Sequence, residues 1–494
     1  MGYLFLTGAT GLLGSYLTRD LLARGTKLAL LVRGTKWASA RQRVESLLER
    51  WEKQAGHALP RPVVFEGNLS APDLGLGADG VRWARDNCSA FMHNAASLTF
   101  QGDGRDTEPY ISNLNGTQNV LEFCSQADIR QFHHVSTAYV CGLRRGRIFE
   151  SELDVGQEHG NDYEISKFES EQMVRAADFP DGLTVYRPGI ILGDSKDGYT
   201  TTYHGFYVPL KLVSSLITQT GGLDVPEEMV VTGIKLGSQR LREILRLTGN
   251  ERKNFVPVDW VSAVMTHVYT NPEHHRQTYH LTPRRPVPVE VFQRVMEQMF
   301  LKYTRIKSKA KATNVDWSEF ERFFLEQMEV YRSYWGDDPE FDSTNTQTIA
   351  PHLRCPELDD TMFRRMCEYA IESNFGWPKP PVVKPEFDAA DHLTDLASTD
   401  AEAADIQLGL QVNGLGGGQW AVQVKDGQPV SVVPGIHSKC TARFYMNSQT
   451  FKRLAEEQTS VEEEVRTGRL LIEGNGLPPE QLRGILAKVA QKKA

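Results

Sequence analysis

Residues 3–14 read YLFLTGATGLLG, and this stretch decides the fold. Its first four residues form an apolar run typical of a buried strand, and the residues from Leu12 onward (LLGSYLTRDLLAR) have the pattern of an amphipathic helix. The glycines between them permit a tight turn and a close approach of the backbone to a pyrophosphate, whose charge the helix N-terminus stabilises. Residues 3–14 therefore predict the first strand, turn and helix of a dinucleotide-binding domain.

The same alternation continues to about residue 190. Short apolar runs such as LALLVR, PVVFEGN, AFMHNAA, FHHVSTAYV and LTVYRPGIIL are separated by amphipathic stretches. Strands that alternate with helices in this way are typical of βαβ units and a parallel sheet. We therefore predict an α/β fold with a doubly wound parallel sheet of the Rossmann type.

Length and composition limit the remaining possibilities. The chain has 494 residues, 40% hydrophobic and 24% charged, which suggests a globular protein with about two to four domains. Its net charge of −8 supplies no basic field, so we expect no nucleic-acid partner. The six cysteines have neither a CxxC motif nor a metal-ligand spacing, so we expect no disulfide framework and no metal site.

The pattern divides the chain into four predicted parts. Residues 1–300 form the dinucleotide-binding domain, in which a smaller substrate region occupies mainly 195–300. Residues 301–375 are a helical extension, and the proline-rich, then acidic residues 376–404 have the composition of a linker. Residues 405–494 predict a small α+β module. They alternate around an Asp426-Gly427 turn, as in an antiparallel sheet, and then show helix starts near Ser448, Ser460 and Pro478-Pro479.

Basic residues follow the second predicted strand. A site that prefers NAD would offer an acidic residue there to the ribose hydroxyls, but this chain has Arg33 directly after the strand and Arg43 further on. A guanidinium can hold a 2′-phosphate, so we predict NADPH as the cofactor. Lys36 and Arg41, which lie nearby, fit the solvated surface of a helix.

Tyr163 and Lys167 are four residues apart, so on a helix they share one face. There the ammonium can lower the pKa of the phenol and bind ribose hydroxyls, which would make the tyrosine a general acid near neutral pH. This spacing also recurs on many solvated helices. The catalytic interpretation gains from Ser136-Thr137, at the end of a strand upstream, which could supply a hydroxyl to position a substrate carbonyl.

Seven motifs then resemble a known family in their order and spacing. They are TGATGLLG (7–14), GNLS (67–70), HNAAS (93–97), NLNGT (113–117), HVSTAYVCG (134–142), YEISK (163–167) and YRPGIILGDS (186–195). Together they resemble the extended short-chain dehydrogenase/reductases. More narrowly, residues 136–142 and 187–195 resemble the fatty-acyl reductases and the thioester-reductase domains that end some carrier-protein assembly lines.

The resemblance implies roles for individual residues. The catalytic trio would be Thr137, Tyr163 and Lys167, and Arg33 would hold the 2′-phosphate. Asn68 departs from the family, which usually has aspartate there, and Asn113 is as consistent with a structural role as with a catalytic one. The predicted cofactor-binding set is Gly8, Thr10, Gly11, Leu12, Leu13, Gly14, Arg33, Arg43, Asn68, Leu69, Ala95, Ala96, Tyr163, Lys167, Pro188, Gly189 and Ile190.

The C-terminal residues carry a second resemblance. Residues 420–435, 440–457 and 466–475 are similar to the sterol-carrier-protein fold, a small α+β module with an apolar tunnel. The resemblance implies that a lipid binds to this module. The alternative is a small domain used for dimerisation or rigidity.

These observations favour an NADPH-dependent reductase of a long-chain acyl thioester, carried by coenzyme A or a carrier protein, that forms an aldehyde or alcohol. The first alternative is a dehydrogenase of hydroxysteroids or other polycyclic lipids. An alternative from another class is a non-catalytic, NADP-sensing lipid-binding protein. Residues 206–208 and Leu210 fit either an acyl pocket or a buried helix. The N-terminus has no signal-peptide pattern and no stretch has the length of a membrane span, so we expect a cytoplasmic protein with at most peripheral membrane contact.

Overall fold

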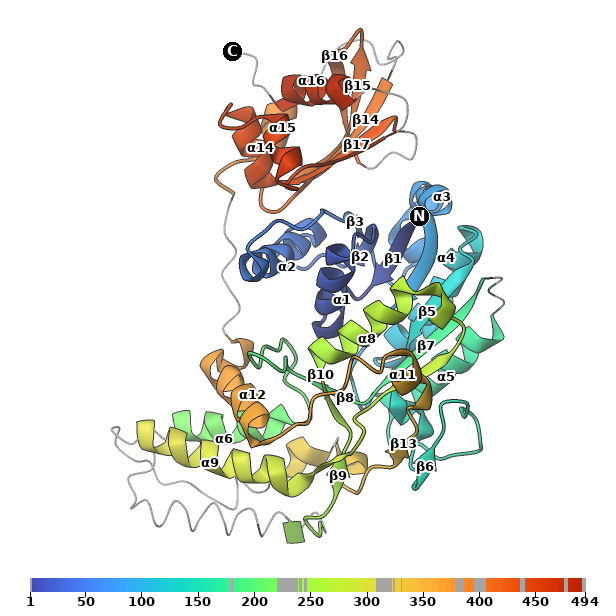
Figure 1. Cartoon of the computed structure of the whole chain (residues 1–494), viewed down its shortest axis with the longest axis vertical. Coiled ribbons are helices and arrows are strands. Elements are labelled where there is room, and N and C mark those ends of the chain that lie inside the picture. The colour runs from blue at the N-terminus through green and yellow to red at the C-terminus, as the bar shows by residue number, and fades with distance from the viewer. Residues whose placement is uncertain are drawn as a thin grey trace.

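The computed structural model describes the chain except for residues 1, 178, 180, 220–238, 240–241, 244–246, 308–321, 323–324, 330, 378–384, 395–405, 436–439, 475–478 and 491–494. Its centre is a seven-stranded sheet in the order β11-β7-β5-β4-β1-β2-β3 (Figure 1). The strands are β1 (Tyr3–Thr7), β2 (Leu28–Val32), β3 (Val63–Glu66), β4 (Cys88–His93), β5 (Gln131–Val135), β7 (Gly182–Pro188) and β11 (Thr278–Leu281). All neighbouring strands pair in parallel. The predicted doubly wound parallel sheet is confirmed.

Helices cover both faces of this sheet because its strands are apolar on both faces. In β1, Leu4 and Leu6 pack under α1 (Leu12–Ala23), α2 (Ala40–Ala55) and α8 (Val258–Thr270). Tyr3 and Phe5 face the opposite layer, formed by α3 (Gly77–Asn87), α4 (Gly116–Gln126) and α5 (Asp162–Ala176). Strands buried on both faces are expected in parallel sheets.

A second region lies beyond the carboxyl ends of the strands. It contains β8 (Ile190–Leu192), which pairs in parallel with β10 (Phe255–Pro257), and the helices α6 (Tyr207–Gln219), α9 (Val289–Lys307) and α12 (Asp360–Glu372). An aromatic and apolar cluster that includes Phe206, Phe255 and Phe363 holds these elements together. The remaining short elements here are β6 (Arg147–Ile148), β9 (Arg252–Lys253), β12 (Val287–Pro288), β13 (Glu340–Phe341) and α11 (Thr344–Ile349).

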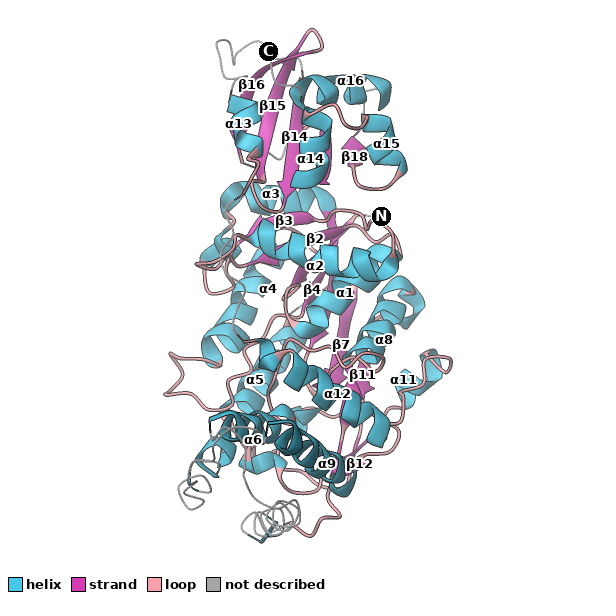
Figure 2. Cartoon of the chain, turned by 90° about the vertical axis from the view of Figure 1, so that its left-hand side faces the viewer, coloured by secondary structure: helices cyan, strands magenta, loops and turns pink. Residues whose placement is uncertain are grey.

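The C-terminal residues build a separate five-stranded sheet, in the order β16-β15-β14-β17-β18. Its strands are β14 (Ile406–Asn413), β15 (Gly418–Lys425), β16 (Gln428–Pro434), β17 (Ala442–Asn447) and β18 (Leu471–Gly474), and its helices are α13 (Ala389–Thr394), α14 (Ser448–Ala455), α15 (Val461–Arg466) and α16 (Pro479–Ala490). We call residues 387–394 and 406–490, as far as the structure describes them, the C-terminal module. Figure 2 shows it stacked beside β3 and α2.

The structure corrects one detail predicted for the C-terminal module and confirms another. The β15–β16 hairpin is antiparallel around Asp426-Gly427 as predicted, but β14 and β17 pair in parallel, so the sheet is mixed. The parallel pair arises because β17 follows the hairpin and returns on the other side of β14. Helix α14 is capped by Asn447, whose side chain accepts from the Thr450 amide, and Ser448 is its first residue.

The division into domains remains a prediction, and much of the predicted linker, like Pro478, lies outside the described residues. Within that predicted linker, α13 packs into the core of the C-terminal module through Ala389 and Leu393. In the part of the chain that the structure describes, no helix combines the length and the apolar character that crossing a bilayer requires.

Candidate active site

A large cavity of about 1100 Å³ opens at the carboxyl ends of the central strands. The ends of β1, β2, β5 and β7 all reach it, as expected for a ligand site in an open α/β sheet. Every residue predicted to bind the cofactor or act in catalysis lines this cavity: Gly8, Thr10, Gly11, Leu12, Leu13, Gly14, Arg33, Arg43, Asn68, Leu69, Ala95, Ala96, Thr137, Tyr163, Lys167, Pro188, Gly189 and Ile190. Their roles remain predictions, but the fold brings them together.

Two glycines of the turn are packed so closely against backbone that neither position has space for a side chain. A Cβ on Gly8 would lie 2.7 Å from the Ala95 nitrogen, and a Cβ on Gly14 would lie 2.0 Å from the Gly8 oxygen. Helix α1 begins after Gly11 with no side-chain cap and no acidic residue in its first turn. Leu12, Leu13 and Gly14 of its first turn line the cavity, so an uncapped helix N-terminus borders this space, and this arrangement fits a pyrophosphate.

Two arginines lie together at the β2 end of the cavity. Arg43 of α2 donates to the carbonyl oxygen of Arg33 at 2.5 Å and to Oγ1 of Thr10 at 2.7 Å. Burial and the neighbouring Arg33 both lower the pKa of Arg43. No carboxylate forms an ion pair with either guanidinium among the residues that the structure describes, and two adjacent cations of this kind suit a phosphate.

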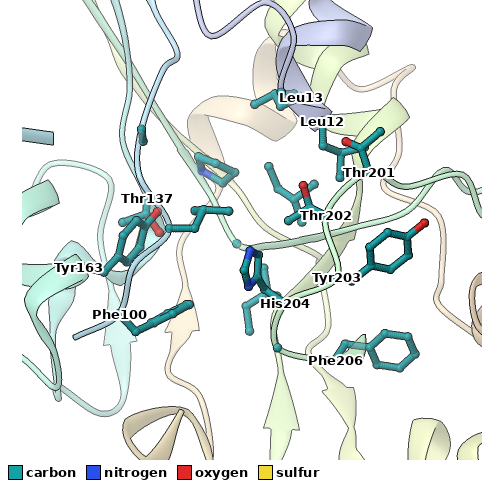
Figure 3. A pocket seen from close by; sticks show the side chains of 18 of the residues that line it. Leu12, Leu13, Phe100, Thr137, Tyr163, Thr201, Thr202, Tyr203, His204 and Phe206 are labelled. Carbon is teal, nitrogen blue, oxygen red and sulfur yellow. The ribbon is translucent and has the colours of Figure 1, made fainter. Parts of the chain in front are cut away.

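Thr137 and Tyr163 lie together on one side of the cavity (Figure 3), and Lys167 also lines it. Tyr163 and Lys167 come from α5, and the Thr137 side chain, which directly follows β5, is hydrogen-bonded to the Tyr163 hydroxyl. Burial, followed by the charge of Glu164, raises the pKa of Tyr163 to about 12. The phenol therefore keeps its proton at neutral pH, as a general acid must.

The Lys167 ammonium is bonded to the backbone of β5, whereas the sequence predicts that it acts on the Tyr163 phenol. This ammonium donates to the Val135 carbonyl oxygen at 2.8 Å, and burial lowers its pKa to about 8. The expected lowering of the Tyr163 pKa by Lys167 is absent, because the ammonium is directed at the β5 backbone, and burial and Glu164 outweigh the lowering by the Thr137 hydrogen bond.

A buried carboxylate supports this side of the site. Glu171, one turn after Lys167, accepts from the Ser136 hydroxyl at 2.6 Å and from the Arg187 guanidinium at 2.6 Å. Arg187 holds the pKa of Glu171 below its usual range in spite of burial. Since the Ser136 hydroxyl is committed to Glu171, the geometry favours Thr137 as the hydroxyl that faces a substrate.

Asn113 lies in a single π-helical turn, and its side chain forms hydrogen bonds with Ser97 and Ser166. Its amide nitrogen donates to the Ser97 carbonyl at 3.1 Å and to the Ser166 hydroxyl at 3.0 Å, and its oxygen accepts from the Ser97 amide. This geometry favours the structural role.

The histidines of the central strands are buried. His93 bonds to the hydroxyls of Thr7 and Thr117, and burial lowers its pKa to about 3. Among the described residues, no three His, Cys, Asp or Glu side chains are placed to hold a metal ion.

The opposite wall of the cavity carries many apolar and aromatic side chains, and polar ones such as Lys211, Arg242 and Glu297 also line the cavity. Figure 3 shows the segment from Thr201 to Phe206 facing Thr137 and Tyr163 across the cavity. Phe100 lies on the side of Thr137 and Tyr163 (Figure 3), where it packs against Tyr163 with ring centroids 5.5 Å apart. Further lining comes from Phe255, Phe292, Met296, Phe300, Met328, Tyr331, Tyr334 and Trp335.

Sequence reasoning missed most of this wall. Of the residues predicted either to line an acyl pocket or to form a buried helix, Phe206 lines the cavity, whereas Tyr207 and Leu210 are buried in the core. The other lining residues come from several segments spread between residues 100 and 335. The one available signal was the concentration of aromatic residues in 318–335.

Comparison with known proteins agrees with this geometry. The model of the family described as male sterility protein matches residues 6–265, more than half of the chain. The chain belongs to this family. It is an oxidoreductase of the short-chain dehydrogenase/reductase superfamily, and its cofactor is a nicotinamide dinucleotide.

Similar fungal proteins include "Nonribosomal peptide synthetase asaC" and "Aldehyde reductase lnaA", both of Aspergillus flavus. The chain is 28% identical to the first over 302 residues and 30% identical to the second over 306 residues. The matches cover 58% and 57% of this chain but only 26% of each relative, so the chain spans about a quarter of their length.

Solved structures share the fold. The terminal R domain from the myxalamid PKS-NRPS biosynthetic pathway has a TM-score of 0.57 at 24% identity, covering 77% of this chain and 93% of that domain. A thiolation-reductase di-domain from an archaeal non-ribosomal peptide synthetase has a TM-score of 0.52 at 18% identity, covering 76% of each chain.

Proposed function

We propose that this protein is an NADPH-dependent reductase of acyl thioesters, with a long apolar acyl chain on coenzyme A or a carrier protein. The observation that carries the proposal is the continuity of the cavity. The glycine turn, the Arg33–Arg43 pair, the trio and the aromatic wall all line the same space. A volume of about 1100 Å³ exceeds the roughly 300–1000 Å³ usual for small-ligand pockets, so a cofactor and an acyl chain fit together. The names of the fungal relatives and the R-domain fold support a thioester substrate.

The residues supply binding, orientation and a proton. When bound, the nicotinamide supplies a hydride, which a thioester carbonyl carbon accepts. Thr137 and Tyr163 would donate hydrogen bonds to the carbonyl oxygen, and Tyr163 would transfer its proton to that oxygen as negative charge develops there. The resulting hemithioacetal loses its thiol when the C–S bond breaks, and the product is an aldehyde. A second hydride and a second proton would convert the aldehyde to an alcohol.

Lys167 would bind ribose hydroxyls through its ammonium. The hydrogen bond to the Val135 carbonyl would hold this ammonium at the cavity, which both residues line. The aromatic wall would exclude water from the acyl chain and shield the reacting carbon. Phe100, Tyr331 and Tyr334 pack edge-on around the approach to Tyr163, with Phe100 ring centroids 5.0 Å from Tyr331 and 5.5 Å from Tyr334. We therefore expect a preference for apolar acyl chains over short polar ones.

The test follows cofactor and thiol together. The protein is incubated with NADPH and a panel of acyl-CoA thioesters, acyl carrier thioesters and sterol ketones, and NADPH absorbance and free thiol are recorded. Release of one thiol per NADPH would show aldehyde formation, and two NADPH per thiol would show alcohol formation. Consumption of NADPH with sterol ketones alone would contradict the proposal and favour the dehydrogenase of polycyclic lipids. No turnover with any substrate, despite NADPH binding, would favour a non-catalytic role.

Lipid binding by the C-terminal module remains a prediction, and it would require the core of the module to open. The cavity inside its described core, lined by side chains such as Leu410 and Phe444, measures about 10 Å³. This is close to the volume of a single water site, so a lipid would have to open the core. Mass spectrometry of the intact protein after purification checks this, since a retained lipid adds its mass to the chain.

A further inference from the structure

The C-terminal module contacts the Rossmann sheet at its open edge. β3 is the last strand of that sheet, so one side of its backbone has no neighbouring strand. The side chain of Gln411 on β14 accepts from the Val64 amide at 2.9 Å and donates to the Pro62 carbonyl at 2.8 Å. Gln419 on β15 donates to the Val64 carbonyl at 2.9 Å and to the Gln411 side chain at 2.9 Å. Two glutamine side chains thus take the place of the missing strand.

The same module holds helix α2 from the side opposite the cavity. Gln419 accepts from the Arg41 guanidinium at 3.2 Å, and Asn447 donates to the Glu45 carboxylate at 2.9 Å. Arg41 and Glu45 are four residues apart and therefore share one face of α2. Arg43 lies between them in sequence and points the other way, to Thr10 at the cavity.

Glu45 shows that this contact is an integral part of the packing. It is only 2% exposed, and its carboxylate pairs with Arg61, which is 3% exposed, at 2.7 Å. The backbone of the module also closes over it, because a Cβ on Gly414 would lie 3.4 Å from Cγ of Glu45. A buried charge is costly unless it is paired and hydrogen-bonded, so removing the Asn447 donor should disturb this side of α2.

β3 is itself coupled to the start of α2. Glu66, at the end of β3, accepts from the Ala40 amide at 2.9 Å, and Ala40 is the first residue of α2. The module therefore reaches α2 by two routes, directly through Arg41 and Glu45 and indirectly through β3 and Glu66. Both routes converge on the turn of helix that carries Arg43.

We propose that the C-terminal module is a built-in brace that positions Arg43 and thereby sets the preference for a phosphorylated cofactor. This proposal rests on the proposed function, in which Arg33 and Arg43 hold the 2′-phosphate. In the brace role the module contributes without binding a ligand of its own, which agrees with its closed core. Gln411, Gln419 and Asn447 are positioning residues, because they act on the phosphate site only through α2 and β3.

The experiment compares the full-length protein with the double variant Gln411→Leu/Gln419→Leu. Leucine keeps the side-chain volume but cannot bond to the β3 edge. Equilibrium binding of NADPH and NADH is measured by calorimetry without any acyl substrate, so the result does not depend on the reaction. We expect NADPH to bind about three- to tenfold more weakly, in line with the loss of hydrogen bonds at the interface, while NADH binding is unchanged. Gln428→Leu, an exposed glutamine of β16, is the matched control and should change neither affinity.

Two further measurements complete the test. Hydrogen exchange should become faster at residues 63–66 in the double variant, and unchanged exchange there would overturn the role of the two glutamines. In an Arg43→Ala background the glutamine substitutions should cause no additional loss of NADPH affinity, because the module acts through Arg43. Equal weakening of NADPH and NADH, or no weakening of either, would overturn the brace.

Asn447→Asp provides a second, milder variant. Aspartate still accepts from the Thr450 amide and so keeps the cap of α14, but it places a negative charge beside Glu45. The same selective loss of NADPH affinity is expected. If Arg43→Ala leaves the preference for NADPH intact, the assignment of the phosphate site fails. If Arg43→Ala abolishes the preference while the glutamine and asparagine variants keep it, the brace alone fails.

Discussion

The replacement of Gly14 by alanine tests the turn on which the cofactor site depends. A Cβ at this position would lie 2.0 Å from the Gly8 oxygen, 2.7 Å from the Gly8 carbonyl carbon and 2.9 Å from Cα of Ala9. All three contacts are backbone atoms, so no side chain can rotate away. Reaching an ordinary contact of 3.4 Å requires α1 and the glycine turn to separate by about 1.4 Å.

The cost of this separation has two parts. Overpacking of this kind costs about 1–3 kcal/mol, offset by up to about 1 kcal/mol because alanine is the better helix former. A displacement of about 1 Å in a binding site can reduce function by about a hundredfold. We therefore expect Gly14→Ala to lower the melting temperature by several degrees and to weaken cofactor binding about 10- to 100-fold.

Gly11→Ala is the matched control within the same motif. Its Cβ would lie 3.4 Å from the Gly8 oxygen, an ordinary contact, and its φ of −76° suits any residue. Thermal melting should therefore change little, and any loss of cofactor affinity measured by calorimetry reports crowding by the ligand itself. Equal melting temperatures and equal affinities for Gly14→Ala and the unaltered protein would refute the reasoning.

Three further predictions follow from the trio and the buried histidines. Tyr163→Phe should lower kcat by about 10²- to 10⁴-fold while calorimetry shows NADPH binding preserved, and a smaller loss would indicate another proton donor. Because the pKa of Lys167 is lowered to about 8, its ammonium is present below that pH and lost above it. The value of kcat/KM for NADPH should therefore fall about tenfold per pH unit above pH 8. A flat pH profile would exclude the binding of ribose by the Lys167 ammonium. Burial lowers the pKa of His93 from its usual 6.5 to about 3 in the fold. As the pH falls below 6.5 the unfolded chain takes up a proton that the folded chain does not, so stability that is present above that pH is lost. From pH 7 to pH 5, His93 alone should lower the free energy of unfolding by about 2 kcal/mol in denaturant titrations. Unchanged denaturation midpoints over this range would contradict it.

The sequence by itself determined the features that short-range patterns encode. The strand, turn and helix of residues 3–14, the order of strands and helices up to about residue 190 and the hairpin at Asp426-Gly427 follow from local periodicity and turn chemistry. The predicted site residues also lie at one cavity, because the carboxyl ends of parallel strands meet at one edge of the sheet.

Only the tertiary structure decided what depends on contacts between distant segments. Phe100, Phe206, Phe292 and Tyr331 share one cavity, although nothing in their spacing relates them. The sequence likewise does not predict that β14 pairs in parallel with β17, or that Gln411 lies at the edge of β3. Local propensity and periodicity describe a residue's own element, whereas packing partners are selected by the sum of many small contacts across the whole fold. The sequence therefore predicts the chemistry of the cofactor turn, but it does not predict the shape of the cavity or the attachment of the C-terminal module.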